Sequence, residues 1–186
     1  MNETLQSILS RRSVRQYKAE QISDSELQII LEMAINAPNA RNLQKWHFTV
    51  IQNREKLDSL AERIVESILN SDNEFLKERV KEPNYNPFYR APTVVMISGE
   101  DGEKYIKVDI GLAIGNMILA AESMNIGTCV IGSPNQLFRT EKAGEAKKEL
   151  GIPEGYTHIC SVLFGYKDGE TPEAKPRSKD VINYIK

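Results

Sequence analysis

The sequence contains little of what disulfide-stabilised and metal-binding proteins require. Its only cysteines, Cys129 and Cys160, stand far apart and outside any C-x-x-C pair, so we interpret both as buried strand thiols without a redox or metal role. Its only histidines, His47 and His158, show no H-x-x-x-H or H-E-x-x-H spacing and alternate along expected strands, which favours structural roles. We therefore predict no metal site.

Long apolar runs and a strong excess of one charge are missing as well. No run approaches the roughly 20 apolar residues of a membrane-spanning helix, and the opening stretch MNETLQSILS lacks the basic and apolar regions of a secretory signal. A cytoplasmic protein without membrane contact is the resulting expectation. The formal net charge of −2 argues against general binding to nucleic acid. Length and composition predict a single globular domain over residues 1–186.

Three widespread motifs of nucleotide binding and catalysis are also absent. The sequence has no G-x-x-x-x-G-K-[ST] phosphate loop, no G-x-G-x-x-G after a strand and no G-x-S-x-G elbow. A Rossmann dinucleotide site is therefore not expected. Asp109 is the only acidic residue well inside an apolar helical segment, and a buried carboxylate with satisfied hydrogen bonds is favoured there over a catalytic group.

The periodicity of apolar residues predicts helices and strands in irregular alternation. Ser23 and Glu26 form an S-x-x-E capping box ahead of a helix over residues 24–37, which Pro38 ends. The longest expected helix, over residues 106–124, is apolar almost all round, which indicates burial on several sides. The other expected elements are helices over 57–68 and 141–150 and strands over 46–52, 93–98, 128–131 and 158–164. This pattern predicts an α+β or mixed α/β fold around one sheet.

Two segments interrupt the regular pattern. Residues 82–92 (EPNYNPFYRAP) contain three prolines and three aromatic residues, too broken for a regular element but apolar enough to cover another part of the protein. We interpret them as a lid or as a loop that faces a second subunit. Residues 166–186 are polar and contain prolines before the apolar ending VINYIK, which suggests an arm that docks at a distance on a second subunit.

The stretch RRSVR, residues 11–15, concentrates positive charge in a slightly acidic chain. Clustered guanidinium groups repel one another unless an anion neutralises them, and phosphate oxygens suit the guanidinium fork. A second basic motif, K-P-R, lies near the other end of the chain at Lys175 and Arg177. The alternative is a solvated turn whose arginines pair with nearby carboxylates, namely Glu20, Asp24 or Glu26.

The stretch PNARNLQKW, residues 38–46, lies between an expected helix and an expected strand. Asn39, Asn42 and Gln44 offer donors and acceptors of the kind that a heterocycle with alternating C=O and N–H groups and a polyhydroxyl chain would require. The alternative is a polar loop in which asparagine serves turn geometry. These residues alone leave both interpretations open.

Six segments in collinear order over nearly the whole chain resemble the flavin-dependent nitroreductase family. They are RRSVRQY, APNARNLQKWHFTVI, the strand AP-TVVMI, YIKVDIGLAIGNMILAAESMNIGTCVIG, LGIPEGY and the closing FGY…KPR. The resemblance implies an α+β fold with a mixed sheet flanked by helices, in an interlocked homodimer. It also implies two FMN molecules in the dimer interface and a C-terminal arm, residues 166–186, that wraps the partner subunit.

The same resemblance implies the residues that would hold FMN. The first basic motif would contact the phosphate, with Arg15 extending toward the ribityl chain or the pyrimidine edge, and Lys175 and Arg177 would reach the phosphate from the other end of the chain. The loop after residue 37 would contact FMN partly from the neighbouring subunit, and one turn would place its backbone near flavin N5. The implied set is Arg11, Arg12, Ser13, Arg15, Pro38, Asn39, Ala40, Asn42, Gln44, Ile131, Gly132, Lys175 and Arg177.

The implied activity is transfer of a hydride from NAD(P)H through flavin N5 to nitroaromatic, quinone or related small acceptors in ping-pong order. No side chain is expected to be an obligatory catalytic acid. Relatives with other chemistry (enone reduction, dehalogenation, flavin fragmentation) and a non-catalytic FMN sensor are the alternatives. Two departures concern the loop: Asn39 and Ala40 replace frequent serines, and Lys45 replaces the usual proline and could bring a cation to the pocket rim.

Overall fold

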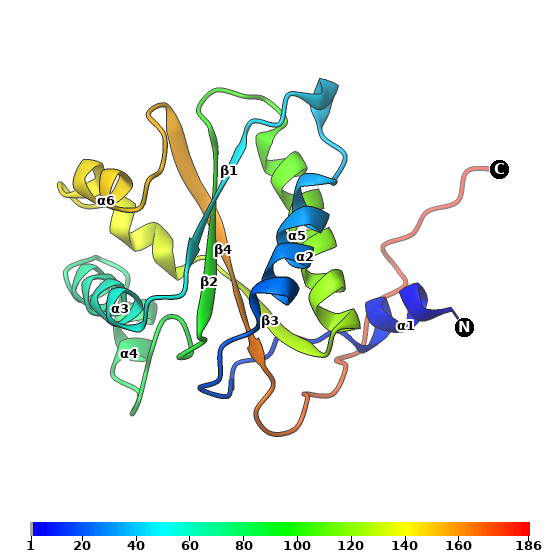
Figure 1. The fold of residues 1–186 in the computed structure, drawn as a ribbon, viewed down its shortest axis with the longest axis horizontal. Coiled ribbons are helices and arrows are strands. Elements are labelled where there is room, and N and C mark those ends of the chain that lie inside the picture. Colours follow the sequence, from blue (N-terminus) through cyan, green and yellow to red (C-terminus); the bar gives the residue numbers. More distant parts are fainter. Residues whose placement is uncertain (1) are drawn as a thin grey trace.

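A four-stranded antiparallel sheet forms the centre of the computed structural model, which describes residues 2–186 (Figure 1). The strand order is β1-β2-β4-β3, so the long β4 lies between β2 and β3. An isolated parallel bridge joins Ser13 to Thr128 at the β3 edge. The strands are β1 (Trp46–Ile51), β2 (Thr93–Glu100), β3 (Ile126–Ile131) and β4 (Tyr156–Tyr166).

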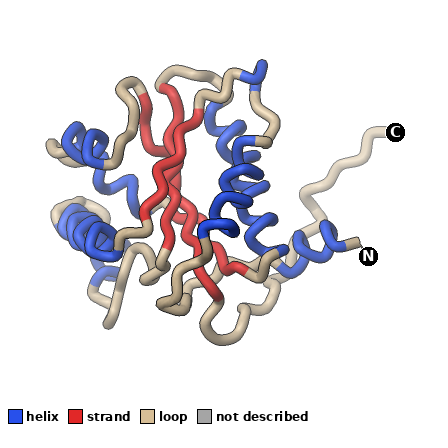
Figure 2. Tube along the Cα trace, in the orientation of Figure 1, coloured by secondary structure: helices blue, strands red, loops and turns tan. Residues whose placement is uncertain are grey.

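Helices cover both faces of this sheet (Figure 2). On one face lie α2 and the long α5, with α1 beside the C-terminal end of α5, and on the other lie α3, α4 and α6 (Figure 1). The α-helices are α1 (Glu3–Ser10), α2 (Asp24–Ile35), α3 (Arg54–Leu69), α4 (Glu74–Val80), α5 (Ile106–Ser123) and α6 (Ala143–Glu149), and the 3₁₀ turns are η1 (Ala40–Asn42) and η2 (Ser133–Phe138).

The central strands are apolar on both faces because each face carries its own core. Alternate side chains of β2 point to opposite sides: Val95 and Ile97 pack toward α2 and α5, whereas Val94 and Met96 pack toward α3. Phe88, from the loop before β2, is buried in the second core. The near-continuous apolar run of β2 thus reflects burial on both faces.

The predicted α+β class and every expected helix and strand are confirmed, with boundaries that differ by a few residues. The short helices α1 and α4 have no counterpart among the predictions. Neither has a fully buried residue: Leu5, Ile8 and Leu9 of α1 are exposed, and Leu76 and Val80 of α4 are only partly buried. Their local signal is an N-cap: the side chains of Asn2 and Asn73 accept hydrogen bonds from the backbone N–H groups of Leu5 and Leu76.

Candidate active site

The basic segment, residues 11–15, runs in extended form along the β3 edge. Val14 anchors it: its N–H donates to the Thr128 carbonyl at 2.8 Å, and its side chain is buried. A Cβ on Gly127 would come within 3.0 Å of the Val14 side chain, so glycine allows this close approach. Because side chains alternate along an extended segment, burying Val14 turns Ser13 and Arg15 to the opposite side.

The arginines of the basic segment find no carboxylate. Within residues 2–186, Arg11, Arg12 and Arg15 form no ion pair, and Glu26 instead accepts hydrogen bonds from Ser23 and Tyr166. The alternative of a solvated turn paired with nearby acids is therefore not what the structure contains. These guanidinium groups are therefore available to an external anion.

Arg12 differs from its two neighbours. Its Nη1 donates to the carbonyl oxygens of Leu9, at 2.6 Å, and of Arg11, at 2.8 Å, at the C-terminal end of α1. Its Nε is buried and has no hydrogen-bond partner within the described chain. Arg12 therefore serves the end of α1 with part of its guanidinium, and Arg11 and Arg15 are better placed to receive an external anion.

Two adjoining cavities open beside Arg15. The smaller, of about 320 Å³, is also lined by the end of β3 and the following turn, which include the predicted residues Ile131 and Gly132. The larger, of about 600 Å³, extends toward Gln16 and Asp168. The residues that line both cavities are Arg15, Arg79, Tyr85, Asn86 and Tyr89.

The Cys129 thiol connects the basic segment to the smaller cavity, whose wall it forms in part. Burial raises the pKa of this thiol, whereas Arg15, Arg11 and the Ser13 hydroxyl act in the opposite direction. Arg11 and Ser13 are therefore close enough to influence a group on the cavity wall. Three predicted residues thus line the smaller cavity, namely Arg15, Ile131 and Gly132, and two more, Arg11 and Ser13, lie near the Cys129 thiol in its wall.

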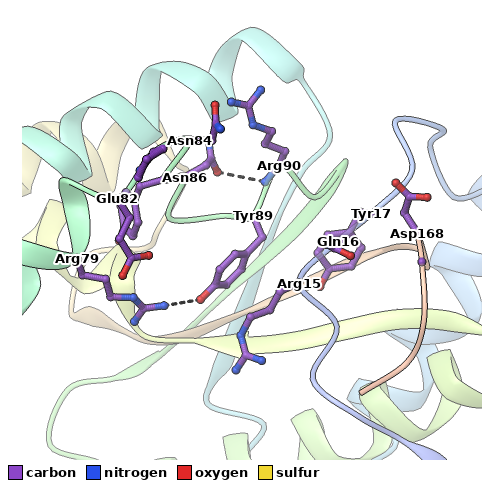
Figure 3. A pocket seen from close by; sticks show the side chains of 13 residues that line it. Arg15, Gln16, Tyr17, Arg79, Glu82, Asn84, Asn86, Tyr89, Arg90 and Asp168 are labelled. Atoms are coloured by element: carbon purple, nitrogen blue, oxygen red, sulfur yellow. Dashed lines mark hydrogen bonds between the residues drawn. The ribbon is translucent and has the colours of Figure 1, made fainter. Parts of the chain in front are cut away.

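The expected lid, residues 82–92, supplies much of the wall of both cavities. Tyr89 accepts a hydrogen bond from Nη2 of Arg79 at 2.6 Å, while the guanidinium of Arg15 lies 5.8 Å from the centre of the Tyr89 ring (Figure 3). This arrangement places one phenol between two cations. Sequence reasoning singled out neither Arg79, on α4, nor Tyr89, in the loop before β2, because no local pattern in either element predicts their contact.

The predicted loop, residues 38–44, lies elsewhere. Its Ala40 N–H donates to Oδ1 of buried Asp109 at 3.0 Å, which confirms the predicted satisfied carboxylate near the start of α5. Ser10, next to the basic segment, donates to Glu122 near the other end of α5. Thirteen residues of helix separate Asp109 from Glu122, which corresponds to about 20 Å. In one chain, the two predicted halves of the site are therefore at opposite ends of α5 (Figure 1).

The loop itself has an unusual backbone. Arg41, Asn42 and Gln44 all have positive φ, and the Asn39 side chain holds the turn by accepting a hydrogen bond from the Gln44 N–H at 2.9 Å. Asn39 thus serves turn geometry, as one interpretation of the sequence held, while Asn42 and Gln44 are exposed and available to a ligand. Lys45 pairs with Glu100 at 3.0 Å, so its charge already has a partner within the chain.

The C-terminal segment, residues 167–186, leaves the body beyond β4 and extends past α1 (Figure 1). Lys175 and Arg177 are exposed on it and line neither cavity beside Arg15. Within this single chain, the structure does not bring them to the basic segment.

The turn after Gly132 is tied to the sheet by a buried histidine. Nδ1 of His158 lies 2.8 Å from Oδ1 of Asn135, Nε2 lies 2.9 Å from the Ser161 hydroxyl, and the ring stacks on Phe138. Burial lowers the pKa of His158 to about 4. This neutral histidine has the structural role expected for it, and it fixes the η2 turn next to the smaller cavity.

Two features are absent from the described chain. No helix of residues 2–186 combines the length and apolar character needed to cross a membrane. Across the same residues, no group of three or more His, Cys, Asp or Glu side chains is arranged to hold a metal ion.

Comparison with known proteins identifies the family. Residues 8–166 match the nitroreductase family. A nitroreductase with bound FMN from Bacteroides fragilis superposes with a TM-score of 0.93 at 35% identity, covering 100% of both chains, and one from Desulfitobacterium hafniense with 0.92 at 34%, again covering 100% of both. An NADPH-flavin oxidoreductase from Vibrio harveyi is 30% identical over 95% of this chain and 70% of its own length. The chain belongs to the nitroreductase family.

Proposed function

We propose that this protein is an FMN-dependent oxidoreductase that takes a hydride from NAD(P)H and reduces small electrophilic acceptors such as nitroaromatics and quinones. The observation that carries the proposal is the Arg15 guanidinium, which has no carboxylate partner, at a cavity bounded by Ile131 and Gly132. Arg11, also without a carboxylate partner, lies close enough to act on the Cys129 thiol in the cavity wall. The FMN and nicotinamide-dependent activities named for relatives of similar fold agree with it.

The residues present fit FMN. Its phosphate needs cations and donors without internal partners, which Arg11, Ser13 and Arg15 offer, and the buried Nε of Arg12 is a further donor without a partner in the described chain. Its ring needs a cavity with apolar and aromatic walls, which Ile131 and Tyr89 supply in part. We also assign Lys175 and Arg177 to the phosphate. Because they lie on the exposed arm, the arm would have to move or dock to bring them there.

Bound FMN supplies the hydride and electron chemistry. The chain's own groups bind and orient it and exclude water. Reduction would add negative charge to a flavin bound beside Arg15. The positive charge of Arg15 stabilises that negative charge and so favours reduction of the flavin. Tyr85 and Tyr89 line both cavities and would lie against a bound ligand, where they would displace water. We infer that donor and acceptor use the same open face in turn, because the sequence contains no separate nucleotide motif.

We further propose a homodimer in which each site is completed by the partner's loop, residues 38–44. A single chain leaves apolar side chains exposed on α5, with Val108 60% and Leu112 43% exposed. The arm, residues 166–186, carries further exposed apolar residues that would dock on the partner. They are Val181, Ile182, Tyr184 and Ile185. The cytoplasmic location expected from the sequence remains a prediction.

The visible spectrum of the purified protein tests this function. We expect oxidised-flavin absorption that NADH or NADPH bleaches without oxygen and that a nitroarene or quinone restores. Absence of flavin after incubation with FMN would contradict cofactor binding. Retained flavin that neither nicotinamide bleaches would favour the sensor alternative. Product analysis with an enone and a halogenated phenol distinguishes nitro reduction from the other flavin chemistries.

A further inference from the structure

The larger cavity beside Arg15 contains two further arginines, Arg79 and Arg90, that the binding of FMN phosphate does not explain. Its wall includes Arg15, Arg79 and Arg90 and the two acids Glu82 and Asp168. None of these five side chains forms an ion pair within residues 2–186. Arg79 also lines the smaller cavity, so its charge adjoins the region assigned to the flavin.

Arg79 is held in place by a tyrosine. One of its guanidinium nitrogens donates to the Tyr89 hydroxyl at 2.6 Å, and a guanidinium group has five N–H donors, so others remain for a ligand (Figure 3). Its side chain is half-buried, which strengthens its interaction with an anion relative to a fully solvated charge. The face of the same Tyr89 ring meets Arg15. Arg79 and Arg15, the cation assigned to FMN, thus contact the same Tyr89 side chain.

The backbone around Tyr89 is held in an uncommon conformation by side-chain hydrogen bonds. Tyr89 and Arg90 have φ values of 49° and 57°, in the left-handed region that such residues rarely adopt. The Asn86 side chain stabilises this turn by accepting hydrogen bonds from the N–H groups of Phe88 and Arg90. Phe88 is buried in the core, and the Ser133 hydroxyl donates to the Pro87 carbonyl at 3.1 Å, which ties the loop to the turn after Gly132.

We propose that Arg79, oriented by Tyr89, determines acceptor specificity by binding a carboxylate of the electron acceptor. An acidic aromatic acceptor would place its carboxylate on Arg79 and its reducible group toward the smaller cavity. This inference rests on the proposed function and deepens it, because it names the preferred class of acceptor as anionic. A planar carboxylate suits the guanidinium fork, and a charge-assisted hydrogen bond is stronger than a neutral one.

The test compares two acceptors that differ in charge, 4-nitrobenzoate and 4-nitrobenzamide, with the FMN-loaded protein. We expect Arg79→Gln to lower kcat/KM for the benzoate by about tenfold or more, mainly through KM, and to change that for the amide less than about twofold. Arg79→Lys should retain part of the preference, and Tyr89→Phe should lose part of it. Arg139→Gln removes the same charge from an exposed residue on neither cavity and serves as the matched control.

Three results would overturn the inference. An equal loss with both acceptors would make Arg79 a structural residue, and a weaker FMN affinity of Arg79→Gln would make it a flavin ligand. A higher KM for NADPH than for NADH in that variant, with acid preference unchanged, would assign Arg79 to a phosphate of the donor. Failure of the proposed function is separate: it would be a wild-type protein that binds no FMN or reduces neither acceptor.

Discussion

The basic segment (residues 11–15) and the loop at residues 38–44 differ in how the fold uses their polar groups. In the basic segment, Val14 and part of Arg12 bond to the chain and Arg15 lies over the Tyr89 ring, but none of the arginines has a carboxylate partner. In the loop, Asn39 and the Ala40 N–H are used to hold a backbone with several positive φ angles. The basic segment therefore leaves its cations available to an anion, whereas the loop uses its polar groups to hold its own turn.

Their separation is equally informative. The basic segment meets the C-terminal end of α5, whereas the loop meets its first turn, about 20 Å along the helix. If both contact one flavin, as the family resemblance implies, they must come from different subunits. The exposed apolar residues of α5 lie on the helix that joins these two regions.

The largest expected effect concerns this two-chain site. Val108→Asp with Leu112→Asp places two carboxylates on the exposed face of α5, and burying them in an interface costs several kcal/mol each. We expect dimer affinity and flavin content to fall by two powers of ten or more, measured by sedimentation and absorbance. Leu69→Asp, on the exposed face of α3, is the matched control. A monomer that keeps its flavin would end the two-chain interpretation.

Within the basic segment, the arginines should differ in their effect on FMN affinity. Arg11→Ala, and Arg177→Ala in the arm, should raise the FMN dissociation constant by about one to three powers of ten, because each removes a charge-assisted contact. Arg12→Ala should raise it less than about tenfold, since part of its guanidinium serves α1. Titration of the apoprotein with FMN measures all three. Equal effects of Arg11 and Arg12 would contradict the distinction between them.

The loop depends on one buried carboxylate. Asp109→Leu leaves the Ala40 N–H without its acceptor and should lower the free energy of unfolding by about 1–3 kcal/mol. Asp109→Asn keeps an acceptor oxygen and should cost less. Urea denaturation gives the stabilities, and FMN titration shows whether the loop also weakens the site. Wild-type stability in Asp109→Leu would show that the contact contributes nothing.

The smallest expected effect is the pH dependence of stability that comes from His158, which fixes the η2 turn next to the smaller cavity. His158 has a pKa of about 4 in the folded protein against 6.5 ordinarily, so the unfolded chain binds more protons between these values. The contribution of His158 to the free energy of unfolding is therefore fully present above pH 6.5 and is lost as pH decreases toward 4. Between pH 7 and pH 5 the loss is about 2 kcal/mol. His158→Gln should flatten this dependence in urea denaturation series. An unchanged slope in the variant would assign the loss to other groups.

Sequence reasoning found the parts with strong local signals. The capping box at Ser23 and Glu26 forms as predicted, and the apolar run of β2 is a central strand. It missed Arg79 and Tyr89, because a short polar helix and a proline-broken loop carry no periodicity that reports their contact. No local pattern explains why Arg12 differs from Arg11, since only the end of α1 decides which guanidinium meets carbonyl groups.

By itself, the sequence determined the α+β class, the order of the elements and the concentration of cations that calls for an anion. Those features depend on local periodicity, capping and charge, which each stretch of chain contains. The tertiary structure alone decided that Arg15 shares a cavity with Arg79 and the turn at Gly132, and that the loop at residues 38–44 lies at the far end of α5. Such relations arise from packing between residues distant in the chain, and packing is a property of the folded molecule.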